Sequence, residues 1–131
     1  MALCPQKNTM STLLLIEDNP VDTHILRRHL EESGFEVLNV TTAEAGLALI
    51  KQDDIAIDGI VLDVVLPGKS GYGLCRELKQ SESTANIPII LCSSKAERMD
   101  KKWGLKQGAN AYLTKPVQGN EIVSIVRQLI A

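Results

Sequence analysis

The sequence has few aromatic residues and few cysteines, and it contains no long apolar run. Aromatic side chains make up 3% of the 131 residues, which argues against stacking on nucleic-acid bases as the main activity. The three cysteines (Cys4, Cys75, Cys92) are an odd number without metal-ligand spacing, a pattern typical of reduced thiols in a cytoplasmic protein. No apolar run approaches the length of a bilayer span. We therefore expect a cytoplasmic protein that does not insert into membranes.

Charge and composition point to one ordinary globular domain. The formal net charge of −2 gives no indication of binding to nucleic acid or to a membrane surface. With 44% hydrophobic and 23% charged residues, the chain can bury a single core. The opening "MALCPQKNTMS" has no apolar core like that of a signal peptide. We interpret residues 1–11 as a flexible leader and residues 12–131 as the domain.

Short apolar runs alternate along the chain with segments whose apolar residues recur every three or four positions. The predicted strands are 13–16, 35–40, 60–62, 89–92 and 111–113, and the predicted helices are 20–33, 42–52, 71–81, 96–107 and 119–130. This strict alternation predicts an α/β fold, in which a parallel sheet is covered by helices on both faces. Right-handed crossovers favour a doubly wound, five-stranded sheet ordered 2-1-3-4-5, the flavodoxin-like three-layer arrangement.

Apolar stripes indicate which helix faces meet the core. The stripe predicted for helix 20–33 consists of Val21, Ile25, Leu26 and Leu30, and that of helix 96–107 consists of Met99, Trp103 and Leu105. Two histidines, His24 and His29, lie five positions apart on the first helix. That spacing is poor for a shared metal, so we interpret both as solvated or partly packed.

Carboxylates occur at the ends of two predicted strands. Asp63 interrupts the apolar run "GIVLDVVL", and Glu17 and Asp18 end the run "LLLIEDN". In the 2-1-3-4-5 order the first and third strands are neighbours, so all three carboxylates meet in one crevice. Like charges at that distance repel unless a cation joins them, and Mg²⁺ is the cation that carboxylate oxygens suit. The alternative is that these residues are merely solvated acids or helix-capping acids. That interpretation is plausible for Asp18 alone, but it is the weaker one for the three carboxylates together.

Two further strand ends carry complementary groups. "PIILCSS" ends with the hydroxyl of Ser93, and "AYLTKP" supplies the ammonium of Lys115. A hydroxyl, an ammonium and a metal directed at one carboxylate suit the handling of a phosphoryl group. We predict that Asp63 is the nucleophile that forms an acyl phosphate. In this interpretation Mg²⁺ and Lys115 hold its oxygens, and Ser93 donates a hydrogen bond to the product.

These motifs together resemble a known family. "LLLIEDNPVD", "DGIVLDVVLPGKSG", "PIILCSS" and "GANAYLTKP" follow the order and spacing of the receiver domain of bacterial response regulators, of which CheY is the single-domain type. The resemblance implies phosphorylation of Asp63 by a histidine kinase or phosphotransfer protein. It also implies Mg²⁺ bound by Asp18, Asp63 and the backbone carbonyl of Val65, with Glu17 acting through water.

The same resemblance implies a switching mechanism and partners. The Lys115–Pro116 peptide bond is expected to be cis, and Tyr112 is expected to swing with Ser93 when the domain switches. The fourth helix, fifth strand and last helix would then present a changed surface to a downstream target protein. The segment "ERMDKKWGLKQGANAYLTKP" resembles regulators of the PilG and PilH kind, which serve pilus motility and phototaxis. We expect a monomer, and a dimer stays open.

The chain departs from the family pattern at several positions. Glu17 stands where aspartate is usual, so the inner metal contact is expected to lengthen or to pass through water. Val65, two residues after Asp63, offers no polar side chain to orient an attacking water, so we predict a long-lived phosphoryl group. Trp103 is either a packed residue or a partner anchor, and its i+4 relation to Met99 favours packing. The basic residues around it, whether a solvated face or a surface that steers an acidic partner, are Lys95, Arg98, Lys101, Lys102 and Lys106.

Two other functions remain as alternatives to a signalling receiver that is not an enzyme in the turnover sense. A small Mg²⁺-dependent phosphatase with an aspartyl nucleophile needs a second aspartate at the position of Val65. A phosphorylation-independent interaction module of the same fold would not need the set of Asp18, Asp63, Ser93 and Lys115. The intact set argues against that module, although Glu17 leaves room for it.

Overall fold

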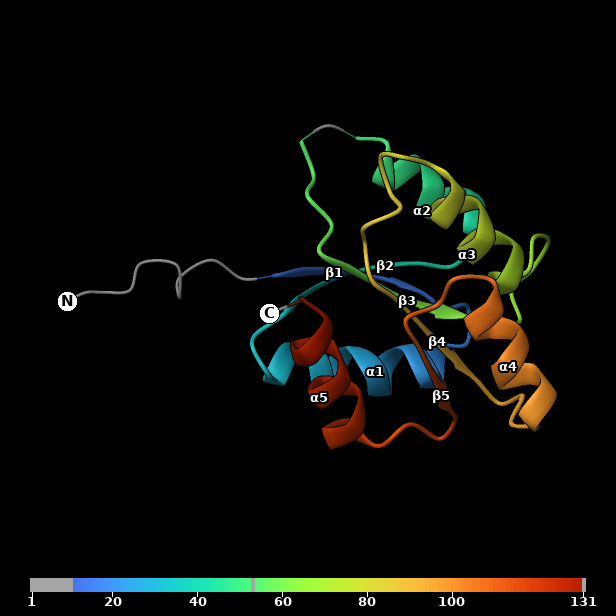
Figure 1. Ribbon diagram of the computed structural model, residues 1–131. Coiled ribbons are helices and arrows are strands. Elements are labelled where there is room, and N and C mark those ends of the chain that lie inside the picture. Colours follow the sequence, from blue (N-terminus) through green and yellow to red (C-terminus); the bar gives the residue numbers. More distant parts are fainter. Residues whose placement is uncertain (1–10, 53, 131) are drawn as a thin grey trace.

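The computed structural model describes residues 11–52 and 54–130, in which five parallel strands form one sheet with the order β2-β1-β3-β4-β5 (Figure 1). The strands are β1 (Thr12–Ile16), β2 (Glu36–Val40), β3 (Gly59–Asp63), β4 (Ile89–Ser93) and β5 (Ala111–Thr114). The helices are α1 (Pro20–Glu32), α2 (Ala43–Ile50), α3 (Gly71–Gln80), α4 (Arg98–Lys106) and α5 (Gly119–Ile130). The predicted doubly wound, flavodoxin-like fold is confirmed. Apart from Ser11, the predicted leader lies outside the described residues.

Alternate side chains of each strand enter two separate cores, one on each face of the sheet. Leu13 and Leu15 point toward the core that includes Leu26 and Leu30 of α1 and Ile122 of α5. Their neighbours in β1 point the other way, into a core that contains buried residues of α2 and α3. Figure 1 shows this layering, with α1 and α5 below the sheet and α2 and α3 above it. Every central strand is therefore covered on both faces, as the continuous apolar runs predict.

The turn from β1 into α1 is determined by a helix cap. The side-chain oxygen of Asn19 accepts hydrogen bonds from the backbone N–H groups of Val21 and Asp22, and Pro20 occupies the first helical turn. This arrangement satisfies two amide donors that the helix itself leaves free. It also fixes the direction in which α1 leaves the carboxyl end of β1, where the charged residues gather.

Part of the predicted α1 stripe is wrong. Leu26 and Leu30 are buried, but Val21 is 66% exposed and Ile25 is 39% exposed. Each helical residue advances about 100° around the axis, so Ile25 lies well to one side of the line through Leu26 and Leu30. Val21 is a further turn away, at the beginning of the helix. Both side chains consequently lie on the outer surface of α1.

The stripe predicted for α4 is also wrong, and Trp103 is exposed although packing was the favoured of its two interpretations. Met99 is 73% exposed, Trp103 49% and Leu105 51%. The helix meets the sheet through Gly104 instead, where an added Cβ would lie 2.8 Å from both Leu91 Cδ1 and Tyr112 Cδ2. Because a glycine makes this contact, the larger apolar residues point outward.

The described part of the chain contains no helix with the length and hydropathy that a membrane crossing requires.

Candidate functional site

An acidic cleft lies at the carboxyl ends of β1 and β3. In the β1–β3 register Ile16 pairs with Leu62, so the residues that come next in the chain, Glu17 after β1 and Asp63 at the end of β3, are close neighbours. One carboxylate oxygen from each of Glu17, Asp18 and Asp63 lies within 4.8 Å of the others. The predicted convergence of the three carboxylates is therefore what the structure shows. The cleft beside them has a volume of about 460 Å³.

Lys115, which follows β5, enters the same cleft as a cation. Its Nζ lies 2.7 Å from Glu17 Oε1, 2.9 Å from Asp22 Oδ2 and 3.2 Å from Asp63 Oδ2. Among the residues that the structure describes, it is the only cation in ion-pair contact with these carboxylates. Burial disfavours the ammonium, but hydrogen bonds to Glu17 and Asp22 outweigh it and raise the pKa of Lys115 above its usual range.

Glu17 is the most deeply buried acid of the cleft, with 1% of its surface exposed. Its Oε1 accepts a hydrogen bond from Lys115, and its Oε2 accepts one from the backbone N–H of Asn19 at 3.1 Å. Burial raises the pKa of Glu17 to about 7, although the hydrogen bonds from Lys115 and Asn19 oppose that rise. Glutamate at this position therefore has both oxygens engaged by the protein. Its action on a metal through water stays a prediction.

Asp63 is the last residue of β3 and is 6% exposed. Its Oδ1 accepts a hydrogen bond from the backbone N–H of Val65 at 3.2 Å. The start of α3 is packed directly against this loop, because Gly71 N donates to Val64 O at 2.8 Å. A Cβ on Gly71 would lie only 2.1 Å from Asp63 O. Glycine is thus required where α3 begins, and the backbone that carries the carboxylate is held in place.

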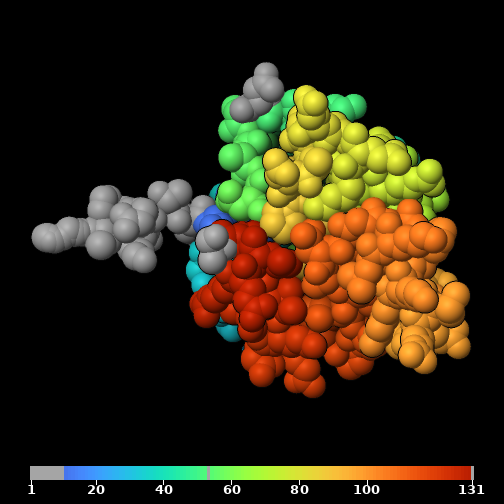
Figure 2. Space-filling model, in the orientation of Figure 1, coloured from blue at the N-terminus to red at the C-terminus, as the bar shows by residue number. Residues whose placement is uncertain are grey.

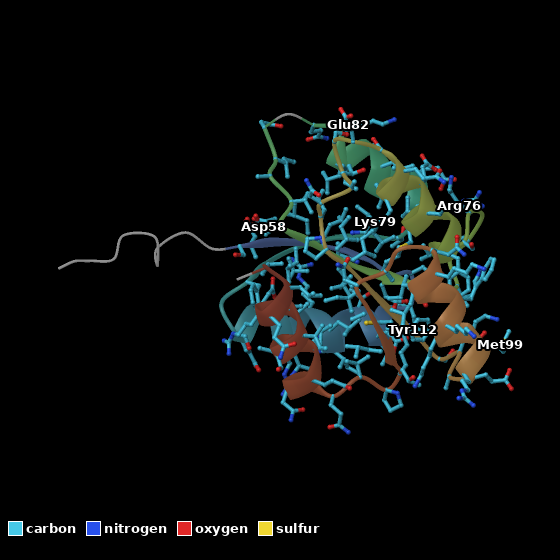
Figure 3. The ribbon with its side chains drawn as sticks, viewed as in Figure 1. Asp58, Arg76, Lys79, Glu82, Met99 and Tyr112 are labelled. Atoms are coloured by element: carbon cyan, nitrogen blue, oxygen red, sulfur yellow. The ribbon has the colours of Figure 1, made fainter. Side chains whose placement is uncertain are left out.

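Ser93 at the end of β4 and Tyr112 in β5 are not among the residues that line the cleft, but both contact Lys95. Ser93 is fully buried at the end of β4, and its Oγ accepts a hydrogen bond from Lys95 N at 3.2 Å. The hydroxyl of Tyr112 donates to Lys95 O at 2.7 Å. Figure 3 shows Tyr112 between β5 and α4, in agreement with its close contact to Gly104. The two residues predicted to move together therefore contact the same loop residue.

Two residues of the site, Asn19 and Asp22, were not predicted as site residues from the sequence. Both line the cleft with Asp63 and Lys115. Asp22 is an ion-pair partner of Lys115, and Asn19 donates its backbone N–H to Glu17. One sequence feature could have indicated Asp22. It is an acidic residue in the first turn of the helix that follows Glu17 and Asp18. Its pairing with Lys115 is not visible in the sequence, because the two residues are 93 positions apart.

The donor set fits a hard divalent cation such as Mg²⁺. Asp18 is exposed to the cleft, Asp63 lies beside it, and Val65 contributes to the lining. Oxygen ligands from one or two carboxylates, completed by water, are what Mg²⁺ prefers. The charge also fits, since Lys115 alone cannot neutralise the surrounding carboxylates. The expected cis peptide bond between Lys115 and Pro116 is present.

Comparisons with known proteins agree with this site. The family model described as "Response regulator receiver domain" matches residues 13–127. Protein PilH from Pseudomonas aeruginosa is 34% identical over 122 residues, which cover 93% of this chain and 99% of PilH. Several other curated relatives are transcriptional regulators, and the chain spans about half of their length.

Solved structures give the same result. A putative response regulator from Chloroflexus aurantiacus has a TM-score of 0.88 and 31% identity, and the match covers 93% of this chain and 98% of that one. The receiver domain of a sensor histidine kinase from Pseudomonas aeruginosa has a TM-score of 0.81 and 31% identity, with 93% and 98% covered. That receiver holds a magnesium ion in its active-site cleft.

Proposed function

The chain belongs to the receiver domain family of response regulators, the signalling modules of two-component systems, and we propose that it relays a signal by accepting a phosphoryl group on Asp63. The observation that carries this proposal is the position of Lys115 Nζ, 3.2 Å from Asp63 Oδ2 at the floor of an acidic cleft. An ammonium at that distance supports both the carboxylate nucleophile and the negative charge of its product. The domain is proposed to extend over residues 12–131.

The reaction requires a nucleophile, a cation and room for the donor. A carboxylate oxygen of Asp63 forms a bond to phosphorus while the bond from phosphorus to the donor's histidine nitrogen breaks. The electron pair of the broken bond stays on the donor's imidazole, which takes up a proton from water to become neutral histidine, and no proton has to be removed from Asp63. The donor is a histidine kinase or a phosphotransfer protein. Lys115 remains next to the reacting oxygens, where it offsets the charge that spreads over them.

Asp18, Asp63 and the backbone carbonyl of Val65 would hold Mg²⁺, with Glu17 acting through water. When bound, the ion supplies neutralisation of charge on the transferring phosphoryl oxygens. The residues of the chain provide the remaining function, because they orient the acceptor and fix the position of the lysine. The burial of Glu17 and its engagement by Lys115 and Asn19 support an indirect contact to the ion.

The proposed output is a change in the surface formed by α4, β5 and α5. Figure 2 shows the residues from α4 to α5, in orange to red, as one continuous surface over the lower half of the molecule. A phosphoryl group draws Ser93 toward it, and Tyr112 follows because both residues contact Lys95. The α4 backbone is affected in turn, since Gly104 lies against the ring of Tyr112.

The exposed residues of α4 indicate the kind of downstream partner. Met99 and Trp103 present apolar surface to solvent, and Figure 3 shows Met99 at the outer edge of the helix. Lys106 Nζ lies 5.9 Å from the centre of the Trp103 ring, so cationic and aromatic groups share this face. We propose an acidic target segment with apolar anchors. A pathway of the pilus-motility type is proposed from the similarity to PilH.

Incubation with acetyl phosphate tests the phosphorylation directly. The protein should gain one phosphoryl group in intact-mass measurements when Mg²⁺ is present, and it should gain none when the metal is chelated. Asp63→Asn should abolish the gain. Asp58→Asn is the matched control. Asp58 directly precedes β3, at the end of the strand opposite Asp63, and accepts a hydrogen bond from Thr12 N. A folded, Mg²⁺-binding protein that gains no phosphoryl group would contradict the proposal and favour a phosphorylation-independent docking module.

A further inference from the structure

We infer that Asp22 is a positioning residue for Lys115: its carboxylate competes with the phosphoryl group for the lysine and thereby limits how tightly Asp63 retains phosphate. This inference rests on the proposed function. Asp22 lies in the first turn of α1, outside the acidic set of Glu17, Asp18 and Asp63. It acts on the reaction only through the lysine that it contacts.

The geometry makes Asp22 a full partner of Lys115. The distance from Lys115 Nζ to Asp22 Oδ2 is 2.9 Å, shorter than the 3.2 Å from the same nitrogen to Asp63 Oδ2. The cap at Asn19 holds Asp22 by its backbone N–H, with a distance of 3.0 Å to Asn19 Oδ1. The carboxylate is therefore presented to the cleft from a helix start whose backbone is held by a cap.

The number of donors on Lys115 creates the competition. An ammonium group carries three N–H donors, and Lys115 contacts three carboxylates, those of Glu17, Asp22 and Asp63. A phosphoryl group on Asp63 brings additional oxygens that need a donor. One existing contact must then be given up. Asp22 is the partner most open to water, with its side chain 31% exposed against 1% for Glu17.

Charge acts in the same direction as the donor count. Asp22 and the incoming phosphoryl group are both negative and both line or occupy the cleft. At close range in a partly buried site this repulsion is significant. Removing the charge of Asp22 should therefore strengthen the binding of a phosphoryl-like anion at Asp63 for two reasons. It frees one lysine N–H and removes one repulsive charge, while Glu17 and Asp63 still hold Lys115.

A merely structural role for Asp22 makes a different prediction. Acidic residues in the first turn stabilise a helix through its dipole, so their loss weakens the fold and every binding event that depends on it. The competition model instead predicts opposite effects on two ligands. An anion that mimics the phosphoryl group should bind more tightly without Asp22. Mg²⁺, which prefers negative charge nearby, should bind no more tightly than before.

Beryllofluoride provides the phosphoryl mimic for the test. Its affinity would be measured by ¹⁹F NMR at saturating Mg²⁺, and Mg²⁺ affinity would be measured separately by calorimetry. The variants are Asp22→Asn and Asp22→Ser, which remove the charge, and Asp22→Glu, which keeps it. The matched control is Glu32→Gln, which removes an exposed carboxylate from the same helix without touching Lys115.

We expect Asp22→Asn and Asp22→Ser to bind beryllofluoride about threefold to tenfold more tightly, the size expected for one partly exposed charge next to an ionic site. Asp22→Glu and Glu32→Gln should stay near the wild-type affinity. Equal or weaker beryllofluoride binding in both neutral variants would overturn the inference while leaving the proposed function intact. A wild-type protein that binds Mg²⁺ but no beryllofluoride would overturn the proposed function and the inference with it.

Discussion

Lys115 Nζ lies 2.7 Å from Glu17 Oε1, although these residues follow strands that are not neighbours in the sheet. In the order β2-β1-β3-β4-β5, two strands separate β1 from β5. The lysine therefore reaches across the carboxyl edge of the sheet to an acid that is 1% exposed. This contact connects the two halves of the doubly wound fold at the place where the reacting group lies.

Replacing this lysine should destabilise the metal-free protein. Lys115→Met leaves buried carboxylates without their cation, and breaking a buried pair on one side costs about 3 kcal/mol. We expect that loss in the free energy of unfolding, measured by urea denaturation in the presence of a chelator. Adding Glu17→Gln to Lys115→Met should recover part of the loss, because the second change removes the uncompensated charge. A double variant as unstable as the sum of both single variants would contradict this coupling.

Alanine substitutions at the two glycines near the start of α3, Gly71 and Gly73, should have opposite effects on stability. Gly71→Ala places a Cβ 2.1 Å from Asp63 O, so the loop carrying the acceptor must move, and we expect a loss of about 2 kcal/mol or more, as for overpacking. Gly73→Ala meets nothing closer than 3.6 Å and should stabilise the helix by about 0.5–1 kcal/mol. Thermal denaturation of both variants measures the difference. Equal effects would show that the close contact at Gly71 is unimportant.

The apolar side chain of Val65 should lengthen the lifetime of the phosphoryl group. Val65 is 54% exposed and lines the cleft, where a polar side chain could orient a water toward the phosphorus. We expect Val65→Asn to accelerate phosphate release by about tenfold, which is below the full contribution of a positioned acid–base group. Val65→Ala should change the rate little. Loss of the phosphoryl mass over time gives both rates, and equal rates in all three proteins would contradict the role of this position.

Trp103 should matter for partner binding and little for stability. Trp103 is 49% exposed on α4, so Trp103→Ala should change the free energy of unfolding by less than about 1 kcal/mol. Leu26→Ala, at a side chain that is 2% exposed, should cost about 2–5 kcal/mol. Chemical denaturation compares the two. A loss at Trp103 as large as that at Leu26 would mean that the tryptophan is a core residue after all.

The sequence was sufficient to predict the sheet order and the meeting of Glu17, Asp18 and Asp63, because strand alternation and right-handed crossovers leave few topologies to choose from. It was insufficient for α4, where the contact to the sheet is made by Gly104 and not by the apolar residues that define the period. It was also insufficient for Asp22. Ion pairs between residues far apart in the sequence form only where the fold brings their side chains together, and no local sequence pattern predicts that.

The most direct test of phosphorylation at Asp63 is to trap the phosphoryl group and locate it. After incubation with acetyl phosphate and Mg²⁺, borohydride reduces an aspartyl phosphate to homoserine, and peptide mass spectrometry identifies the residue that changed. If Asp63 is the acceptor, homoserine appears at position 63, and it is absent when Lys115 is replaced by Met or when the metal is chelated. Homoserine at another carboxylate such as Asp18, or at none in a folded protein that binds Mg²⁺, would contradict this assignment.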